Sequence, residues 1–243
     1  MNMMASIVIP AYKEDENIVR TISELTSTFG ASVEVFVVVD DPMDSTILAF
    51  NSMNSLPNSY KVYVQDLGSG PANAIRFGLG LTNSNCVIVM MADGSDDIRI
   101  IPELVNLVNR GVAVACASRY MPGGQQVGGP RLKKLISKNV GRVLYLIAGV
   151  GTHDPTNSFK AYSKSFLNMV NVESRNGFEV GLELVSKARK LRLPIAEVPT
   201  IWLDRSHGTS RFQLLKWAPK YFRWFVNCFC FWKIPYKDGV KLT

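Results

Sequence analysis

Two stretches decide the fold class: VEVFVVVDD at residues 33–41 and CVIVMMAD at residues 86–93. Each is an apolar run that ends in acid, with Asp40 and Asp41 closing the first stretch and Asp93 closing the second. Apolar runs of this length are typical of parallel strands that are buried on both faces. Open α/β folds bind their ligands in the crevice outside the carboxyl ends of such strands. The sequence therefore predicts carboxylates there that hold a metal ion or sugar hydroxyls.

Strands and helices alternate along the rest of the chain. The 243 residues are enough for one α/β core, and 47% hydrophobic with 19% charged residues is typical of a globular protein. Alternation predicts a mostly parallel central sheet flanked by helices on both faces. We expect strands at 6–10, 33–39, 61–64, 86–91, 112–117 and 195–199, and helices at 14–29, 46–53, from 71, 101–109, 133–148 and 177–191.

The cysteines and the amino terminus indicate a cytoplasmic protein. Four scattered cysteines are too few for a disulfide framework, and Cys86 and Cys116 fall inside expected strands. Residues 1–4 pass directly into a strand without a basic region or a cleavage site. We therefore expect a reducing compartment and no secretion signal.

The positive charge is concentrated in residues 205–243. This stretch has eight Lys or Arg and one acid, so it carries the whole formal net charge of +7, and it holds ten of the 24 aromatic residues. Its longest uncharged run, Trp224 to Trp232, is far shorter than the roughly 20 residues that span a bilayer. Pro219 and Pro235 predict breaks between one or two short amphipathic helices. Basic and aromatic residues together are typical of a segment that lies on a membrane surface, although packing on the core is an alternative.

Several single motifs have ordinary structural explanations. Residues 68–72 (GSGPA) lack the Lys-Ser/Thr of a P-loop and fit a tight turn into a helix. Asp40 or Asp41 could simply cap the next helix. His153 and His207 have no second ligand at metal spacing, which argues against zinc. The basic tail matches no nucleic-acid-binding motif, so we expect no nucleic-acid partner.

The order of the motifs is more specific than any one of them. From residue 6 to about residue 212 the chain resembles the inverting family 2 glycosyltransferases of GT-A fold, and among them the polyprenyl-phosphate sugar synthases of the dolichol-phosphate mannose synthase type. The resemblance implies the GT-A nucleotide-diphospho-sugar transferase fold. The motifs that carry it are IPAYKEDEN (9–17), VVDD (38–41), MAD (91–93), ASRY (117–120), DPTNSFKAY (154–162), GFE (177–179), EVP (197–199) and RSHGTSR (205–211).

The resemblance also implies roles for individual residues. Asp93 would bind the Mg²⁺ or Mn²⁺ that bridges the donor diphosphate, and such an ion together with basic side chains can neutralise the charge of the leaving group. Arg119, Arg205 and Arg211 match the family's basic positions near the phosphates. The nucleotide site would comprise Pro10, Tyr12, Glu14, Asp40, Asp41 and Ala92.

The metal motif departs from the family's pattern. Many relatives have Asp-X-Asp, whereas Met91 stands at the first position here and only Asp93 remains. A thioether does not replace a hard oxygen ligand for Mg²⁺ or Mn²⁺. Asp96 or Asp97 could compensate, one turn beyond the strand. The usual Asp-Asp-Gly/Asn-Ser run is also changed, because Pro42 follows the two acids, and we expect the turn to tolerate it.

The expected acceptor is a lipid phosphate. A sugar hydroxyl needs a carboxylate base, whereas a phosphate oxygen is already anionic. The Gln-X-X-Arg-Trp motif of processive polysaccharide synthases is absent. Lys133, Lys134 and Ser137 instead fall where the lipid-phosphate enzymes bind the acceptor phosphate, with Asp154 near them, although the two lysines could be ordinary solvated residues. For a hydroxyl acceptor the candidate bases are Asp154, Glu179 and Glu183.

The resulting hypothesis is a peripheral enzyme on the cytoplasmic face of a membrane. Residues 1–211 would form the GT-A domain and residues 212–243 a basic-aromatic membrane-interface segment. The enzyme would transfer a sugar from a GDP- or UDP-linked donor to polyprenyl or dolichyl phosphate, docked by its tail or by a membrane-protein partner. Two alternatives are a soluble family 2 enzyme that acts on a surface-glycan hydroxyl and, because of Met91, a catalytically weak nucleotide-sugar binding subunit.

Overall fold

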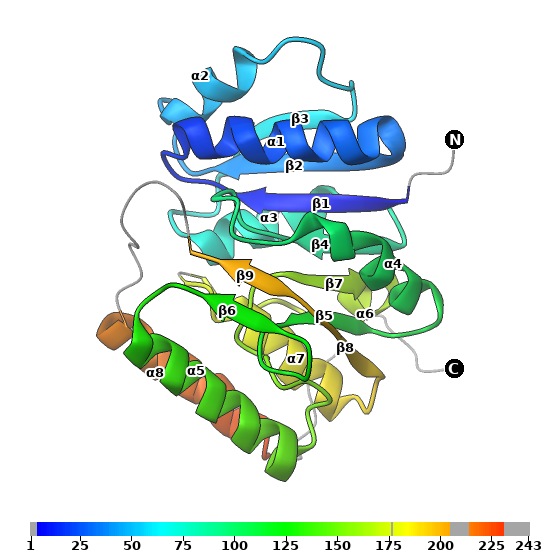
Figure 1. Ribbon diagram of the computed structural model, residues 1–243, viewed down its shortest axis with the longest axis vertical. Helices are drawn as coiled ribbons and strands as arrows, with labels where there is room; N and C mark the ends of the chain where they lie inside the picture. Colours follow the sequence, from blue (N-terminus) through cyan, green and yellow to red (C-terminus); the bar gives the residue numbers. More distant parts are fainter. Residues whose placement is uncertain (1–3, 176, 205–213, 231–243) are drawn as a thin grey trace.

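A seven-stranded sheet forms the centre of the computed structural model, which describes residues 4–175, 177–204 and 214–230 (Figure 1). Its strand order is β3-β2-β1-β4-β7-β5-β8. All neighbouring strands are parallel except β7, which runs antiparallel between β4 and β5. The strands are β1 (Ala5–Pro10), β2 (Val33–Val39), β3 (Tyr60–Val64), β4 (Cys86–Val89), β5 (Val114–Ser118), β7 (Lys160–Ser163) and β8 (Ile195–Pro199). The predicted mostly parallel sheet is confirmed.

Two apolar clusters cover the two faces of this sheet. Alternation of side chains along β1 places Ile7 and Ile9 in one cluster with α1 and α4, and Val8 in the other with α3 and α7. Helix α3 lies so close to β1 that a Cβ on Gly78 would be 2.4 Å from a methyl carbon of Val8. The helices are α1 (Asp15–Phe29), α2 (Ser45–Asn51), α3 (Pro71–Leu81), α4 (Ile101–Asn109), α5 (Arg131–Val143), α6 (Lys164–Met169), α7 (Val180–Lys190) and α8 (Leu214–Asn227), with 3-10 turns η1 (Gly30–Ser32) and η2 (Ile98–Ile100).

Helix α5 continues directly into a π-helical turn, η3 (Leu144–Ala148). The helix expected over 133–148 is therefore present, and it changes from α-helical to π-helical at Leu144. A second, two-stranded parallel sheet joins β6 (Gln125–Val127) to β9 (Ile201–Leu203). It lies between α5 and the main sheet in Figure 1. The sequence analysis did not anticipate β6, β7, β9 or α6, which are short elements with little apolar periodicity.

Strand β4 ends at Val89, two residues earlier than expected. The Met90 amide still donates to Val8 of β1, but the Met91 amide turns away and donates to Oδ2 of Asp96 at 2.9 Å. Asp93 therefore lies in a turn beyond the strand rather than at its tip.

The carboxyl-terminal helix α8 packs on α7. Trp224 and Cys228 are buried in the same cluster as α7. Pro219 lies inside α8, so the break predicted at this proline is wrong, whereas Pro235 and the boundary at residue 212 lie outside the described residues. Within the described part of the chain, no helix has both the length and the apolar character needed to cross a membrane.

Candidate active site

A cavity of about 950 Å³ opens at the carboxyl ends of β1 and β2 and extends to α5, α7 and α8. It gathers most of the predicted site residues, but Ala92 and Asp154 are not part of its wall. Arg205 and Arg211 lie outside the described residues. The predicted residues that line it are Pro10, Tyr12, Glu14, Asp40, Asp41, Asp93, Arg119, Lys133, Lys134 and Ser137.

The loop after β1 is fastened to the start of α2. The Lys13 amide donates to both carboxylate oxygens of Asp44, at 3.0 and 3.1 Å, and the Glu14 amide donates to Oγ1 of Thr46 at 3.0 Å. Lys13 has φ of 53°, a left-handed conformation that needs such support in a residue other than glycine. The fastened loop presents Tyr12 and Glu14 to the cavity.

Asp40 has a structural role that its sequence motif does not reveal. Its Oδ1 accepts from Nε2 of Gln65 and its Oδ2 accepts from the amide of Gly70, both at 2.7 Å. Asp40 thus holds the turn that begins α3 against the end of β2, and Gly70 itself lines the cavity. Asp41 is exposed, and its Oδ1 accepts from the Met43 amide at 2.8 Å. The two acids therefore differ: Asp40 shapes the pocket, while Asp41 faces solvent at its edge.

The turn after β4 contains oxygen atoms that could hold a divalent cation. Asp93 lines the cavity, and its Oδ1 accepts from the Ser95 amide at 3.1 Å. Ser95 also lines the cavity, and its hydroxyl is buried with no hydrogen-bond partner among the described residues. Mg²⁺ is commonly held by one or two carboxylates together with substrate phosphates. Asp93 and Ser95 fit this pattern, and the sequence analysis had missed Ser95.

Protein ligands alone would not complete a metal shell. Across the described ranges, no three His, Cys, Asp or Glu side chains are grouped so that they could hold a metal ion. Met91 lines the cavity at the position where the Asp-X-Asp pattern would have a carboxylate. Asp96 does not replace it, because its Oδ2 is bound by the Met91 amide and it does not reach the cavity wall. A bound ion would take its remaining ligands from the donor diphosphate and from water.

Asp96 has a raised pKa. Burial is the main cause and the nearby Asp93 charge adds to it, whereas the Met91 amide and the Arg119 charge oppose it, leaving a pKa of about 7. An unfolded aspartate titrates near pH 4. Between pH 4 and 7 the unfolded chain thus binds fewer protons at this position than the folded protein, so stability falls as pH rises through that range.

Replacing Asp96 with asparagine should remove this pH dependence. The amide oxygen can still accept from the Met91 amide, while the cost of ionising a buried carboxyl is absent. In metal-free buffer at pH 8 we expect Asp96→Asn to exceed the wild type in unfolding free energy by up to about 4 kcal/mol. Urea denaturation at pH 5 and pH 8 measures the effect. If the difference in unfolding free energy between Asp96→Asn and the wild type were the same at pH 5 and pH 8, this prediction would be wrong.

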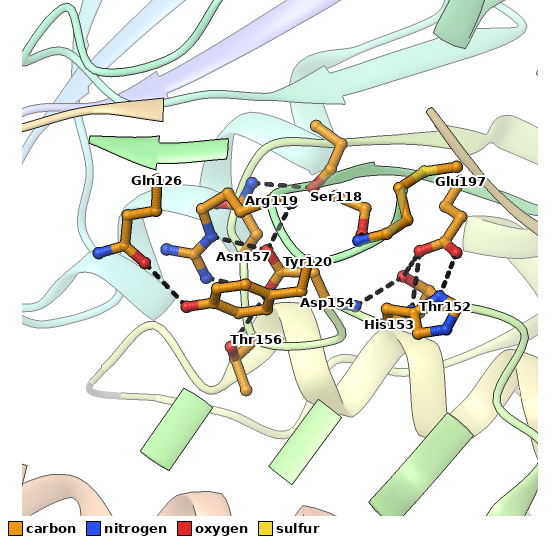
Figure 2. Close-up of polar contacts among 12 residues, drawn as sticks. Ser118, Arg119, Tyr120, Gln126, Thr152, His153, Asp154, Thr156, Asn157 and Glu197 are labelled. Carbon is orange, nitrogen blue, oxygen red and sulfur yellow. Dashed lines mark hydrogen bonds and ion pairs between the residues drawn. The ribbon is translucent and has the colours of Figure 1, made fainter. Parts of the chain in front are cut away.

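Arg119 and Asp154 form a buried ion pair behind the cavity (Figure 2). Nε of Arg119 donates to Oδ2 of Asp154 at 2.6 Å, Nη2 donates to Oδ1 at 2.9 Å, and the Arg119 amide adds a third bond. Burial alone would raise the pKa of Asp154, but the Arg119 charge and its hydrogen bonds lower it below the usual range. Arg119 reaches the cavity wall while Asp154 is fully buried. Asp154, which was expected at the acceptor site, thus binds Arg119 and is not part of the cavity wall.

The other end of the cavity combines basic and apolar groups. Nζ of Lys134 donates to the carbonyl of Gln126 at 2.8 Å, the Tyr120 hydroxyl donates to Oε1 of Gln126 at 2.8 Å, and Ser137 hydrogen-bonds Tyr120. Lys133, Lys134 and Ser137 are thus brought together at the wall, as predicted. The apolar side chains beside them are Ile136 and Val140 of α5, Leu182 of α7, Phe178, and Tyr221, Phe222 and Phe225 of α8.

The remaining candidate bases lie away from the wall. Glu183 is fully buried and accepts from the amides of Glu173 and Ser174 at 2.6 and 2.8 Å. Glu179 is buried too, and neither glutamate lines the cavity. Asp204 does line it, although the sequence analysis did not select it. Asp204 could have been selected from the sequence because it follows the EVP motif by a few residues.

Comparison with known proteins agrees with this geometry. A family model described as glycosyl transferase family 2 matches residues 6–170. The chain belongs to that family. Among curated family 2 relatives, a dolichol-phosphate mannosyltransferase of Pyrococcus furiosus is 30% identical over 216 residues, which cover 86% of this chain and 59% of the relative. A polyprenol monophosphomannose synthase of Mycolicibacterium smegmatis is 28% identical over 212 residues, 84% of this chain and 79% of the relative.

A solved structure of glucosyl-3-phosphoglycerate synthase from Mycobacterium tuberculosis shares the fold. It superposes on this family 2 chain with a TM-score of 0.68 at 19% identity, covering 98% of this chain and 82% of that one. The predicted GT-A fold is thereby confirmed. The chain spans only about three fifths of the length of the Pyrococcus relative.

Proposed function

We propose that this protein is an inverting glycosyltransferase that moves a sugar from a nucleotide sugar to a polyprenyl or dolichyl phosphate. One observation carries the proposal: a single cavity has the family's nucleotide residues at one end and two lysines beside an apolar wall at the other. The names of the two curated relatives, which are mannosyl transferases to lipid phosphates, support this substrate class.

At the donor end, Pro10, Tyr12 and Glu14 would contact the nucleotide at the mouth of the loop that Asp44 fastens. Asp93 and the Ser95 hydroxyl would hold Mg²⁺ or Mn²⁺, an ion that neutralises charge on the departing diphosphate. The Mycobacterium tuberculosis synthase was crystallised with Mn²⁺ and uridine diphosphate, in line with this assignment. Arg119 would bring a fixed positive charge to the same wall, held in place by Asp154.

At the acceptor end, Lys133 and Lys134 would attract a lipid monophosphate, with Ser137 as an additional donor. A phosphate oxygen is anionic at neutral pH and needs no general base to attack the anomeric carbon. Glu179, Glu183 and Asp154 lie away from the cavity wall, which fits an acceptor of this kind. The apolar side chains of α5, α7 and α8 would contact the first isoprene units.

The outer face of α5 and η3 supports attachment to a membrane surface. Leu132, Leu135, Leu146 and Ile147 are each more than half exposed. The basic residues of the same helix are interspersed with them, as in helices that lie on anionic lipid. Trp224, in contrast, faces the protein, so α8 contributes less of this surface than its composition suggested. We place the enzyme on the cytoplasmic face of its membrane, with a membrane-protein partner as a further possible anchor.

A donor screen tests the proposal. GDP- and UDP-linked radiolabelled sugars are incubated with the protein and with polyprenyl phosphate in phospholipid vesicles, with Mn²⁺, Mg²⁺ or EDTA. We expect one donor to give a chloroform-soluble, mild-acid-labile product only when metal and lipid phosphate are both present. Lys133→Ala should reduce the rate by about tenfold or more through loss of a charged phosphate contact. Lys61→Ala, an exposed lysine of β3 that is outside both the cavity wall and helix α5, is the matched control.

Two other outcomes would overturn the assignment. Label that appears only in a water-soluble glycan would identify a hydroxyl acceptor, for which Asp204 is the carboxylate at this wall to test as the base. Nucleotide binding without metal-dependent turnover would identify a binding subunit.

A further inference from the structure

The helix that carries the acceptor residues is attached to the protein by few side chains. Over α5 and η3, only Gly141, Leu144 and Ala148 are buried. Gly141 lies directly on the loop that holds His153, because a Cβ there would be 2.0 Å from the His153 carbonyl oxygen. No larger residue fits at this contact. This close contact therefore ties the end of α5 to the His153 loop, in addition to the contacts of Lys134 with Gln126 and of Ser137 with Tyr120.

His153 makes the second contact between this loop and the helix. Its ring stacks on that of Tyr145 in η3, with centroids 3.7 Å apart and an angle of 23° between the planes. Nδ1 of His153 lies 2.6 Å from Oε1 of Glu197, whose other oxygen accepts from the His153 amide at 2.8 Å and from the Thr152 hydroxyl at 3.1 Å. Glu197 of β8 thus holds the imidazole (Figure 2), and the face of the ring contacts Tyr145 of η3.

The same short segment also holds the basic group of the cavity. Thr152, His153 and Asp154 are consecutive, and Asp154 binds Arg119 through both carboxylate oxygens. The Asp154 amide donates to the Thr152 hydroxyl at 3.1 Å, a hydrogen bond that links the first and last residues of this segment. One rigid turn therefore sets the position of Arg119 on one side and of α5 on the other.

We propose that His153 is a positioning residue for the acceptor site: held by Glu197, it sets through Tyr145 the position of α5 and so of Lys133, Lys134 and Ser137. This inference rests on the proposed acceptor role of those three residues. Neither His153 nor Tyr145 lines the cavity, so both act at a distance from the substrate. Loss of the stack should change how well the acceptor binds and leave donor binding unchanged.

A double-mutant cycle between His153 and Tyr145 tests this role. The variants are His153→Ala, Tyr145→Leu, which keeps an apolar side chain, and the double variant. Each single change should raise the KM for polyprenyl phosphate by about three- to tenfold, the range expected from loss of an aromatic pair, and leave kcat within twofold. In the His153→Ala background, Tyr145→Leu should have no further effect, since the two side chains act as one unit. His153→Phe, which retains a stacking ring, should recover part of the loss.

Two further measurements distinguish positioning from general damage. Nucleoside diphosphate affinity should be unchanged in all variants, and amide hydrogen exchange of residues 131–148 should be faster in His153→Ala. Asn139→Ala, an exposed change on α5 with no part in these contacts, is the matched control and should match the wild type in every assay. Unchanged acceptor KM in an active protein, or additive effects in the double variant, would overturn the inference. Failure of the wild type to use lipid phosphate would instead refute the proposed function, while the exchange result would still report on the attachment of α5.

Discussion

Replacing Asp93 with alanine is expected to abolish sugar transfer, with kcat reduced by about 10³-fold or more. The Asp-X-Asp pattern would offer two carboxylates to the metal, but Met91 leaves Asp93 as the only carboxylate of the motif in this chain. Ser95, two residues further on, adds a neutral hydroxyl. Removing Asp93 would leave a hydroxyl and the substrate phosphates, which together bind Mg²⁺ or Mn²⁺ weakly. Asp93→Ala should therefore reduce kcat more than removing one carboxylate does at a site that has two.

The Asp93 result is measured as transfer rate against Mn²⁺ concentration, together with Mn²⁺ affinity in the presence of nucleoside diphosphate. Asp97→Asn is the matched control, because Asp97 is in the same turn but pairs with Arg99 and does not line the cavity. It should keep the wild-type metal dependence. Undiminished activity of Asp93→Ala would mean that the metal assignment is wrong.

The second large effect is expected at Asp154. Asp154→Asn leaves the guanidinium of Arg119 buried with no carboxylate, and breaking a buried ion pair from one side typically costs about 3–5 kcal/mol. Urea denaturation at pH 7 measures this loss. Since Arg119 lines the cavity, transfer activity should fall as well, even under conditions where the variant remains folded.

Acid titration provides a second signature of this ion pair. The pKa of Asp154 is lower in the folded protein than its usual value near 4, so its contribution is complete above that pH and is lost as pH falls through the lowered folded pKa. The difference in unfolding free energy between the wild type and Asp154→Asn should accordingly become smaller below about pH 4. Glu24→Gln is the control, because Glu24 and Arg20 form an exposed pair worth about 0–1 kcal/mol. A loss at Asp154 no larger than at Glu24 would contradict the prediction.

Much of the fold could be predicted because its main strands are long and apolar. The runs that became β1, β2 and β4 have little alternative to burial, and Ile101–Asn109 was predicted residue for residue as a helix. Strand β7 could not be recognised in the same way. It begins with Lys160, a fully buried lysine whose ammonium donates to the Asn157 carbonyl, and such a residue contradicts the apolar pattern of a central strand. Pro219 was misread because a helix can absorb one proline where solvent or neighbouring groups satisfy the freed carbonyl.

The candidate site was predicted as a set of residues rather than as a set of contacts. The ordered motifs selected residues that the fold brings to one cavity: those expected to bind the donor, the expected metal ligand Asp93, and the two lysines expected to bind the acceptor. Sequence order does not show that Asp154 pairs with Arg119, 35 positions away, or that Asp40 is tied to Gln65 and Gly70. The sequence predicts ligand contacts for these two carboxylates, and it cannot show their protein partners because residues distant in sequence come together only on folding. Ser95 was missed because a single serine belongs to no recognisable motif.

The antiparallel strand β7 also dictates an order of assembly during synthesis. β1, β2, β3 and β4 pair among themselves, so the donor half of the sheet can form once Val89 has left the ribosome. Among the residues that the structure describes, β5 pairs with β7 and β8 alone, and both follow it in the chain by more than 40 residues. Until Lys160 emerges, Val114–Ser118 is therefore a buried-type strand with two open edges, the kind of segment that aggregates or recruits chaperones. In a nascent chain stalled before β7, strands β1 to β4 would already be paired, while both edges of β5 would still be exposed.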